Sequence, residues 1–286
     1  MITRRKFVAG GLVAGCGCGF HSPLFASDEV ARRASGSIEG VKSSAGCFVS
    51  TGDFNRSNLG LLGSGQISSF KAGDTSYLVS ETSGNRLFDR ALAEALFQMS
   101  QLFDVLPTFG FINGGNVVNA FATTALYDRE DGDADLPKRE DGTVLFGDGI
   151  VGYLQKKGVQ DPVAAVLAVC AHEFGHIVQF RYVYKDKPVI SLLNDDQPTV
   201  KRGELHADFL AGFYVGSAAK RNPNTPSADV ALAASVLGDF DTDHKGHHGT
   251  PKERQAAVHE GYKLAYEKNE TFGNALIYGL DYVGAI

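Results

Sequence analysis

The chain of 286 residues lacks a membrane-spanning run, an internal repeat and any long stretch of low complexity. These absences leave one domain of ordinary size, with enough chain for a full hydrophobic core. An excess of positive charge is also missing, because 27 Lys and Arg residues face 33 Asp and Glu residues and give a net charge of −6. Such an acidic balance disfavours nucleic acid and anionic membranes as partners.

Cysteine is scarce as well, with four residues in the chain. Cys16 and Cys18 lie in the N-terminal segment, which leaves Cys47 and Cys170. These two could pair in an oxidising compartment. Cys170, however, lies in the apolar part of a predicted helix, and we expect it to be a small core residue.

The first residues resemble a twin-arginine export signal, with Thr-Arg-Arg-Lys-Phe-Val at positions 3–8 and an apolar, Gly-rich stretch up to Phe20. This stretch is too short and too rich in glycine for a transmembrane helix. Two alternatives stay open for where this segment ends: cleavage after Ala26, or acylation of Cys16 in a lipobox-like Val-Ala-Gly-Cys. Either one predicts an exported, periplasmic or envelope protein, and loss of residues 1–26 removes three cations and lowers the net charge to −9.

The most informative stretch is residues 172–176, which read H-E-F-G-H. It lies in a run predicted to form one helix, with Asp161 as N-cap and Pro162 in the first turn. Positions i and i+4 lie on one face of a helix, so the imidazoles of His172 and His176 can reach one ion. Glu173 is rotated by about 100° from His172 and stands beside the ion, where a general base for water is needed.

A second predicted helix, residues 201–212, offers further ligands. Glu204 and Asp208 are four residues apart, so one helix face presents two carboxylates. One carboxylate can complete a His, His, Glu set around Zn²⁺ and leave the fourth position to water, while the other can accept the free N–H of a ligating histidine. The alternative interpretation is a buried ladder of charged residues without a metal.

The strings H-E-F-G-H-I-V-Q and E-L-H-A-D-F-L-A-G resemble the gluzincin zinc metallopeptidases, and among them the neutral zinc metallopeptidases of bacteria. Residues 248–254 are similar to the H-G-[ST]-x-x-x-R segment of these proteins, and residues 119–122 and 142–146 resemble segments of related gluzincins. The similarity extends over residues 85–267. One departure is His206, which stands where the family pattern usually has Gln and which we do not expect to bind metal.

This resemblance implies an α+β, zincin-like fold in which two helices carry H-E-x-x-H and E-x-x-x-D. It implies Zn²⁺ as cofactor, with His172, His176 and Glu204 as ligands. Asp208 would then orient a zinc-bound histidine, which we expect to be His172. The implied activity is hydrolysis of peptide bonds in a peptide or protein substrate, with Glu173 as general base.

The region before the motif is expected to frame the site. Residues 27–84 are rich in Ser and Gly, with β-like pieces at 46–49 and 76–79, and form either a leader or a small sheet beside a catalytic domain of residues 85–286. A helix is predicted from Asn85 to about Val105, where apolar residues recur at helical spacing and indicate the wall behind the zinc helices.

β-structure is predicted over Phe109–Leu126 and again over residues 142–147. In enzymes of this kind an edge strand above the metal binds an extended peptide through backbone hydrogen bonds. We expect residues 142–147 to be that edge strand, because their glycines let another backbone come close. The alternative is an ordinary buried strand.

Further helices are predicted towards the C-terminus, one from Ser227 to about Leu237 and one from Thr250 to about Glu267. Thr250 and Glu253 have the spacing of a capping box, with a proline in the first turn. His259 is expected on the exposed face of this last helix.

The loop at residues 239–248 concentrates acidic residues and histidines. The functional interpretation puts His248 or His247 at the site, where it stabilises the oxyanion, while Arg254 holds the loop. The alternative is a polar loop followed by a well-capped helix.

These observations predict a zinc metallopeptidase of the bacterial cell envelope. Two alternatives stay open: a zinc-containing envelope protein without peptidase activity, and a lipoprotein with a structural or binding role and an incidental zinc site. Glu173 disfavours the first alternative, because structural zinc sites usually have four protein ligands and need no base.

Overall fold

The structure is a computed structural model that describes residues 2–4, 59–61, 67–72, 75–80, 82–113, 118–124, 141–194, 200–225, 227–236 and 247–286. Within these residues the chain is a mixed α+β protein, mostly helical, with a six-stranded and a three-stranded sheet. The predicted α+β class is therefore confirmed. The expected cleavage position after Ala26, the lipobox cysteine Cys16 and the β-like piece at 46–49 lie outside the described residues.

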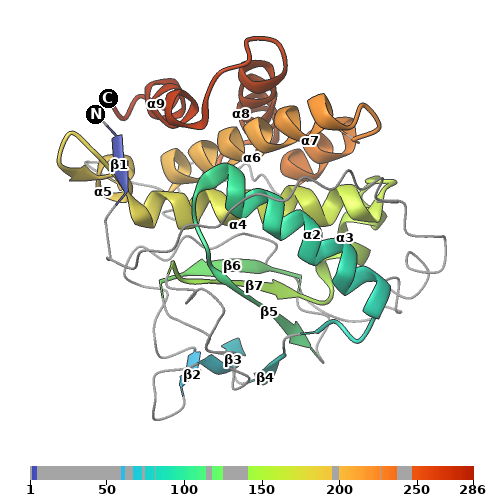
Figure 1. Cartoon of the computed structure of the whole chain (residues 1–286). Helices are drawn as coiled ribbons and strands as arrows, with labels where there is room; N and C mark the ends of the chain where they lie inside the picture. The colour runs from blue at the N-terminus through green and yellow to red at the C-terminus, as the bar shows by residue number, and fades with distance from the viewer. Residues whose placement is uncertain are drawn as a thin grey trace, which may run out of the picture.

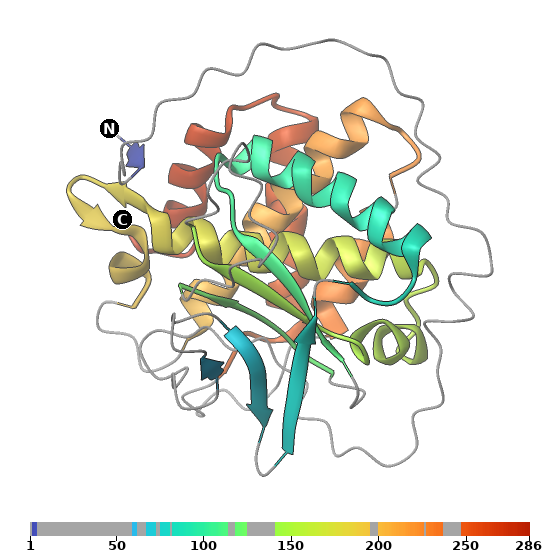
Figure 2. The ribbon, with the colours of Figure 1, turned by 60° about the horizontal axis from the view of Figure 1, so that its bottom comes forward.

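The larger sheet combines strands from both expected regions of the chain. Its order is β2-β3-β4-β5-β7-β6, in which β5 and β7 run parallel and all other neighbours are antiparallel. Figure 2 shows the β3–β4 hairpin reaching away from the helices. Since β4 pairs with β5, the sheet runs across the domain boundary expected at residue 84. The strands are β2 (Leu59–Leu61), β3 (Ile67–Ala72), β4 (Thr75–Ser80), β5 (Thr108–Asn113), β6 (Ala120–Thr123) and β7 (Thr143–Gly147).

The prediction that residues 142–147 form an edge strand is wrong. β7 lies between β5 and β6, and all five of its residues are buried. Its apolar Val-Leu-Phe segment is covered on both faces, as in a central strand. Gly142 has a positive φ (+112°), and a Cβ atom there would overlap the backbone carbonyl of Thr123, so the segment that this glycine lets come close is β6 of the same sheet. In the described part of this sheet the edge next to β7 belongs to β6.

All five predicted helices are confirmed, although α6 extends nine residues beyond the predicted range of 201–212. They are α2 (Arg86–Phe103), α4 (Pro162–Arg181), α6 (Lys201–Arg221), α7 (Ser227–Val236) and α8 (Pro251–Tyr266). Three helices had not been predicted, namely α3 (Ile150–Lys156), α5 (Val189–Asn194) and α9 (Phe272–Tyr282). The hydrophobic stripe of α2 faces inward, because Leu92, Met99 and Phe103 are buried.

Helix α4 is the central element of the fold. Figure 1 shows α4 and α6 running side by side above β5, β6 and β7, with α2 along α4 and with α8 and α9 beyond α6. The residues from Ala164 to Ala171 are all buried, as expected for a helix that is apolar on every side. Cys170 is a free, buried thiol in this stretch, in agreement with the core position predicted for it.

Helices α6 and α8 pack with their backbones in close contact. A Cβ atom at Gly212 of α6 would overlap the backbone of Val258, and one at Gly261 of α8 would overlap the backbone of Phe209. Small residues at these crossing points let the two helices approach more closely than ordinary side chains allow. The start of α8 is thereby held against the start of α6.

A smaller sheet follows α4, in the order β1-β8-β9. It is built from β1 (Ile2–Arg4), β8 (Tyr182–Tyr184) and β9 (Lys187–Pro188). The end of α4 is fixed from both sides, because Arg181 forms an ion pair with Asp141 (2.7 Å) and the Tyr182 hydroxyl donates to the carbonyl of Phe103 (3.0 Å). No helix among the described residues is long and apolar enough to cross a membrane.

Candidate metal centre

The two histidines of H-E-x-x-H are presented by α4. This helix begins as predicted, with the Asp161 carboxylate accepting a hydrogen bond from the backbone N–H of Ala164 (3.3 Å). His172 and His176 lie one turn apart, their ring centroids are 4.6 Å apart, and the ring planes are nearly perpendicular. Both side chains are almost completely buried.

Helix α6 brings its two carboxylates to the same place. Glu204 and Asp208 are buried and lie one turn apart. The helices α4 and α6 approach closely at Gly175 and Ala207, where a Cβ atom on the glycine would come within 2.9 Å of the alanine Cα atom. This contact lies between the histidines on one helix and between the carboxylates on the other. The crossing point of the two helices therefore coincides with the site.

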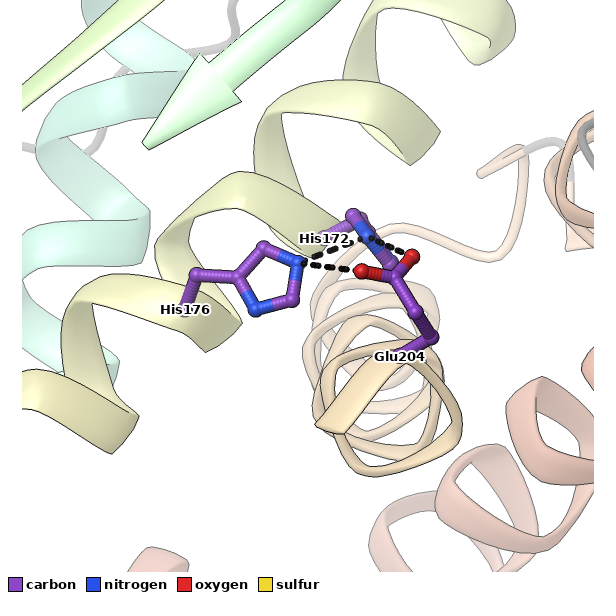
Figure 3. A group of neighbouring side chains, drawn as sticks. All are labelled: His172, His176 and Glu204. Carbon is purple, nitrogen blue, oxygen red and sulfur yellow. Dashed lines mark hydrogen bonds and ion pairs between the residues drawn. The ribbon is translucent and has the colours of Figure 1, made fainter. Parts of the chain in front are cut away.

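Three of the predicted residues, His172, His176 and Glu204, converge on one point. Figure 3 shows both rings from α4 turned towards the Glu204 carboxylate of α6. The Nε2 atoms of the rings are 3.0 Å apart, and each lies 3.4 Å from a different oxygen of Glu204. One ligand atom from each residue lies within 4.8 Å of the others, so the group can hold a metal ion.

Hydrogen bonds on the opposite side of each ring determine which nitrogen carries the proton. Nδ1 of His172 lies 2.8 Å from Oδ1 of Asp208, and a carboxylate can only accept. Nδ1 of His176 lies 3.0 Å from Oε1 of Gln179. Both Nδ1 atoms are therefore donors, and in neutral rings both Nε2 atoms carry lone pairs that point into the centre. Asp208 thus contacts the histidine that the sequence analysis assigned to it.

The arrangement fits a divalent metal ion. Two imidazole lone pairs and a carboxylate facing one another repel unless a cation lies between them. A tetrahedral ion with bonds of 2.0–2.1 Å separates its ligand atoms by about 3.3 Å, close to the distances found here. Charge points the same way, because two carboxylates, Glu204 and Asp208, are buried beside a single buried guanidinium, Arg254.

Glu173 has no partner within the described residues. Its side chain is fully buried, and neither carboxylate oxygen makes a hydrogen bond there. A buried carboxylate without donors is costly in free energy, so its presence beside two metal-ligand histidines requires a reason. Burial raises the pKa of the Cys170 thiol, and the nearby charge of Glu173 raises it further.

Arg254 reaches into the centre from α8, and the role expected for it in holding the loop stays a prediction. Its Nε and Nη2 atoms donate to both oxygens of Asp208, at 2.6 and 2.8 Å. Nη2 also lies 3.3 Å from Nδ1 of His172 and 3.8 Å from Glu204. Although burial acts in the opposite direction, Arg254 and His172 hold the pKa of Asp208 below its usual range. Asp208 is therefore a carboxylate that links the guanidinium to the first histidine.

His248 lies against the third residue of the cluster. Its Nδ1 atom is 3.0 Å from Oε2 of Glu204. Although burial alone would raise the pKa of Glu204, the neighbouring imidazoles of His248, His172 and His176 hold it well below the usual range. The assignment of His248 to the oxyanion stays a prediction, and residues 239–246 of its loop lie outside the described residues.

The remaining predictions on histidines agree with the structure. His206 is buried but does not belong to the cluster of His172, His176 and Glu204. His259 is exposed on α8, as expected. Sequence analysis missed Gln179, which contacts His176 and lies three residues after it on the same helix. That i, i+3 spacing is the signal that could have identified it.

Comparison of the chain with protein-family models, curated proteins and solved structures gives no match. The residues of the centre form a buried set of two imidazoles and one carboxylate, which can hold a metal ion.

Proposed function

We propose that the protein is a zinc-dependent metallopeptidase. The observation that carries this proposal is the convergence of His172, His176 and Glu204 with both Nδ1 atoms already hydrogen-bonded to acceptors. Two imidazoles and one carboxylate form the donor set of many catalytic zinc sites, which keep a fourth position for water or substrate. A structural zinc site would instead use four protein ligands.

Glu173 supplies the second part of the proposal. When bound, Zn²⁺ acts as a Lewis acid that makes water a stronger acid and polarises a carbonyl group. The Glu173 carboxylate takes a proton from water as the water oxygen bonds to the scissile carbonyl carbon. It then delivers this proton to the amine nitrogen as the C–N bond breaks. Neither oxygen of this carboxylate makes a hydrogen bond within the described residues, which leaves both available to accept from water.

The residues around the ligands keep the centre in this state. Asp208 and Gln179 hold each imidazole with Nε2 free for the ion. Arg254 keeps Asp208 ionised, and His248 contacts the carboxylate of Glu204. Each ligand side chain is therefore oriented by a neighbour, which limits the reorganisation required when the ion binds.

For the substrate we propose a peptide or an extended segment of a protein. A carboxylate that acts as base beside a Lewis acid suits the attack of water on an amide carbonyl, the bond that such a substrate supplies.

The test combines metal content with peptide cleavage. Purified wild-type protein should contain about one zinc per chain and cleave a mixed fluorogenic peptide library, with chelator abolishing cleavage. Glu204→Ala should lose zinc, whereas the exposed control His259→Ala should keep both zinc and activity. Glu173→Gln should keep zinc but lose several orders of magnitude in rate.

The outcomes separate the competing interpretations. Zinc without cleavage in the wild type would favour a zinc-containing protein with a binding role. Absence of zinc from the wild type and from metal-reconstituted protein would mean that the cluster is a ladder of buried polar residues. Near-normal cleavage by Glu173→Gln would refute the assignment of the base.

A further inference from the structure

Gln179 is a fully buried side chain that uses its whole amide within the centre. Its Oε1 atom lies 3.0 Å from Nδ1 of His176, and its Nε2 atom lies 2.8 Å from the carbonyl oxygen of Gly203 and 3.2 Å from Nδ1 of His206. Both amide hydrogens and the amide oxygen are therefore engaged. Such a satisfied buried amide has one orientation only.

The partners fix the direction of every bond in this network. The Gly203 carbonyl can only accept, so Nε2 of Gln179 must face it, and Oε1 must face His176. Nδ1 of His176 is then a donor. The second N–H of the amide points at His206, whose Nδ1 atom must be an acceptor. The ring of His206 is accordingly the neutral tautomer protonated on Nε2.

The ring of His206 is completely buried and is held in place by α9. The ring packs on Gly279 of α9, where a Cβ atom would come within 3.0 Å of its Cδ2 atom. Helix α9 therefore holds His206, and His206 holds Gln179.

The bond to Gly203 adds a connection between the two ligand helices. Gly203 directly precedes Glu204, so the Gln179 amide ties the backbone beside the third ligand of α6 to the second histidine of α4. One side chain thus fixes the ring of His176 and the start of the turn that carries Glu204. Asp208 and Arg254 do the same for His172 from the other side, with charged groups.

We propose that Gln179 is a positioning residue of the metal centre and that His206 orients it. This inference rests on the proposed zinc site. Gln179 selects the tautomer of His176 that offers Nε2 to the ion, and it holds Glu204 at the distance that the ion requires. Because its acceptor is a neutral amide, His176 is held without the additional negative charge that Asp208 brings to His172.

The experiment measures zinc affinity of folded protein by competition with a chromophoric chelator. Gln179→Met should weaken zinc binding by about 10- to 100-fold, the usual effect of losing a group that orients a ligand. The matched control is Gln255→Met, which makes the same change at an exposed position of α8 and should leave the affinity unchanged. Unfolding of the metal-free variants by urea separates this effect from a loss of stability.

Two further variants test the orienting role of His206. His206→Asn keeps an acceptor near the position of Nδ1, so zinc affinity should stay close to wild type. His206→Leu removes the acceptor and should weaken binding in the same direction as Gln179→Met. The Co²⁺-substituted proteins give a second readout, because displaced ligands change the visible absorption of the bound ion, which a purely structural role would not alter.

The results distinguish this inference from the proposed function. Wild-type zinc affinity and an unchanged Co²⁺ spectrum in folded Gln179→Met or His206→Leu would overturn the positioning role, while leaving the zinc site intact. If Gln179→Met does not fold, the pair His206→Leu and His206→Asn decides, and equal affinities in that pair would overturn it. If the wild type binds neither metal, the zinc site itself falls, and the positioning role falls with it.

Discussion

The contact between α4 and α6 at Gly175 offers the sharpest test of how the fold supports the centre. A Cβ atom at this position would lie 2.9 Å from Cα and 3.1 Å from Cβ of Ala207. The nearest atoms are backbone or a methyl group, so no flexible side chain can move aside. Because carbon atoms pack at about 3.5–4.0 Å, Gly175→Ala should push the helices apart by roughly 0.6 Å.

Two opposing effects set the size of the change. Overpacking a well-filled interior costs about 1–3 kcal/mol. Alanine in a helix is favoured over glycine by up to about 1 kcal/mol, which offsets part of that cost. Gly273 of α9 provides the matched control, since a Cβ atom there would meet nothing within 4 Å. Gly175→Ala should therefore be about 1–3 kcal/mol less stable than Gly273→Ala.

The assay is urea unfolding of both variants, with and without zinc, together with peptide cleavage. Separation of the helices moves His172 and His176 away from Glu204, so zinc should stabilise Gly175→Ala less than it stabilises the wild type. Misplacement of reacting groups by about 1 Å can cost 100-fold in rate, and a loss up to that size is expected. Equal stability and equal zinc affinity in the two glycine variants would refute the reasoning.

Other perturbations test the charged groups beside the centre, each by urea unfolding. Arg254→Met leaves the buried Asp208 without its cation and should cost about 3–5 kcal/mol, whereas a loss below about 1 kcal/mol would mean that the pair is not buried in solution. Thr250→Ala removes one half of the capping box of α8 and should cost about 1 kcal/mol. Although burial acts in the opposite direction, hydrogen bonds from Lys201 and Thr250 lower the pKa of Glu253 to about 2. The contribution of Glu253 to the free energy of unfolding is therefore complete above the unfolded pKa of about 4.3 and is lost as the pH falls towards 2. In Glu253→Gln the free energy of unfolding should accordingly change less with pH over that range.

Local patterns in the sequence were sufficient to predict the helices of the centre. The start of α4 follows from Asp161 and Pro162, and the start of α8 from the spacing of Thr250 and Glu253. The i, i+4 spacing of Glu204 and Asp208 likewise predicts two carboxylates on one face of α6. In each case the deciding pattern lies within one or two turns of a single helix.

Contacts between distant segments could not be predicted in this way. The position of β7 depends on β5 pairing with it in parallel, and residues 114–142 between them carry no signal of partner choice. The glycines of residues 142–147 were consistent with an exposed edge and equally with the positive φ of Gly142. Strand order is set by which faces the helices cover, and that information is spread over the whole chain.

Side-chain networks are still harder to derive from sequence. Arg254 reaches Asp208 only because α6 and α8 approach at Gly212 and Gly261, which no spacing within either helix reveals. Gln179 could have been noticed from its i, i+3 relation to His176, but its bonds to Gly203 and His206 depend on the same tertiary packing. The groups that orient ligands are thus less visible in the sequence than the ligands themselves.

The charge of the centre links its chemistry to the stability of the fold. Arg254 compensates the charge of Asp208 through a close ion pair. Glu204 and Glu173 are also buried, on α6 and α4, and in the described part of the chain no cation contacts Glu173 in a comparable way. Uncompensated buried carboxylates oppose folding, so a divalent ion bound by the native state would stabilise the fold, in addition to its role in the proposed hydrolysis. The ion would join α4 to α6 at their closest approach. Release of the ion should therefore loosen the two helices that form the middle of the core, which makes metal binding and folding parts of one equilibrium.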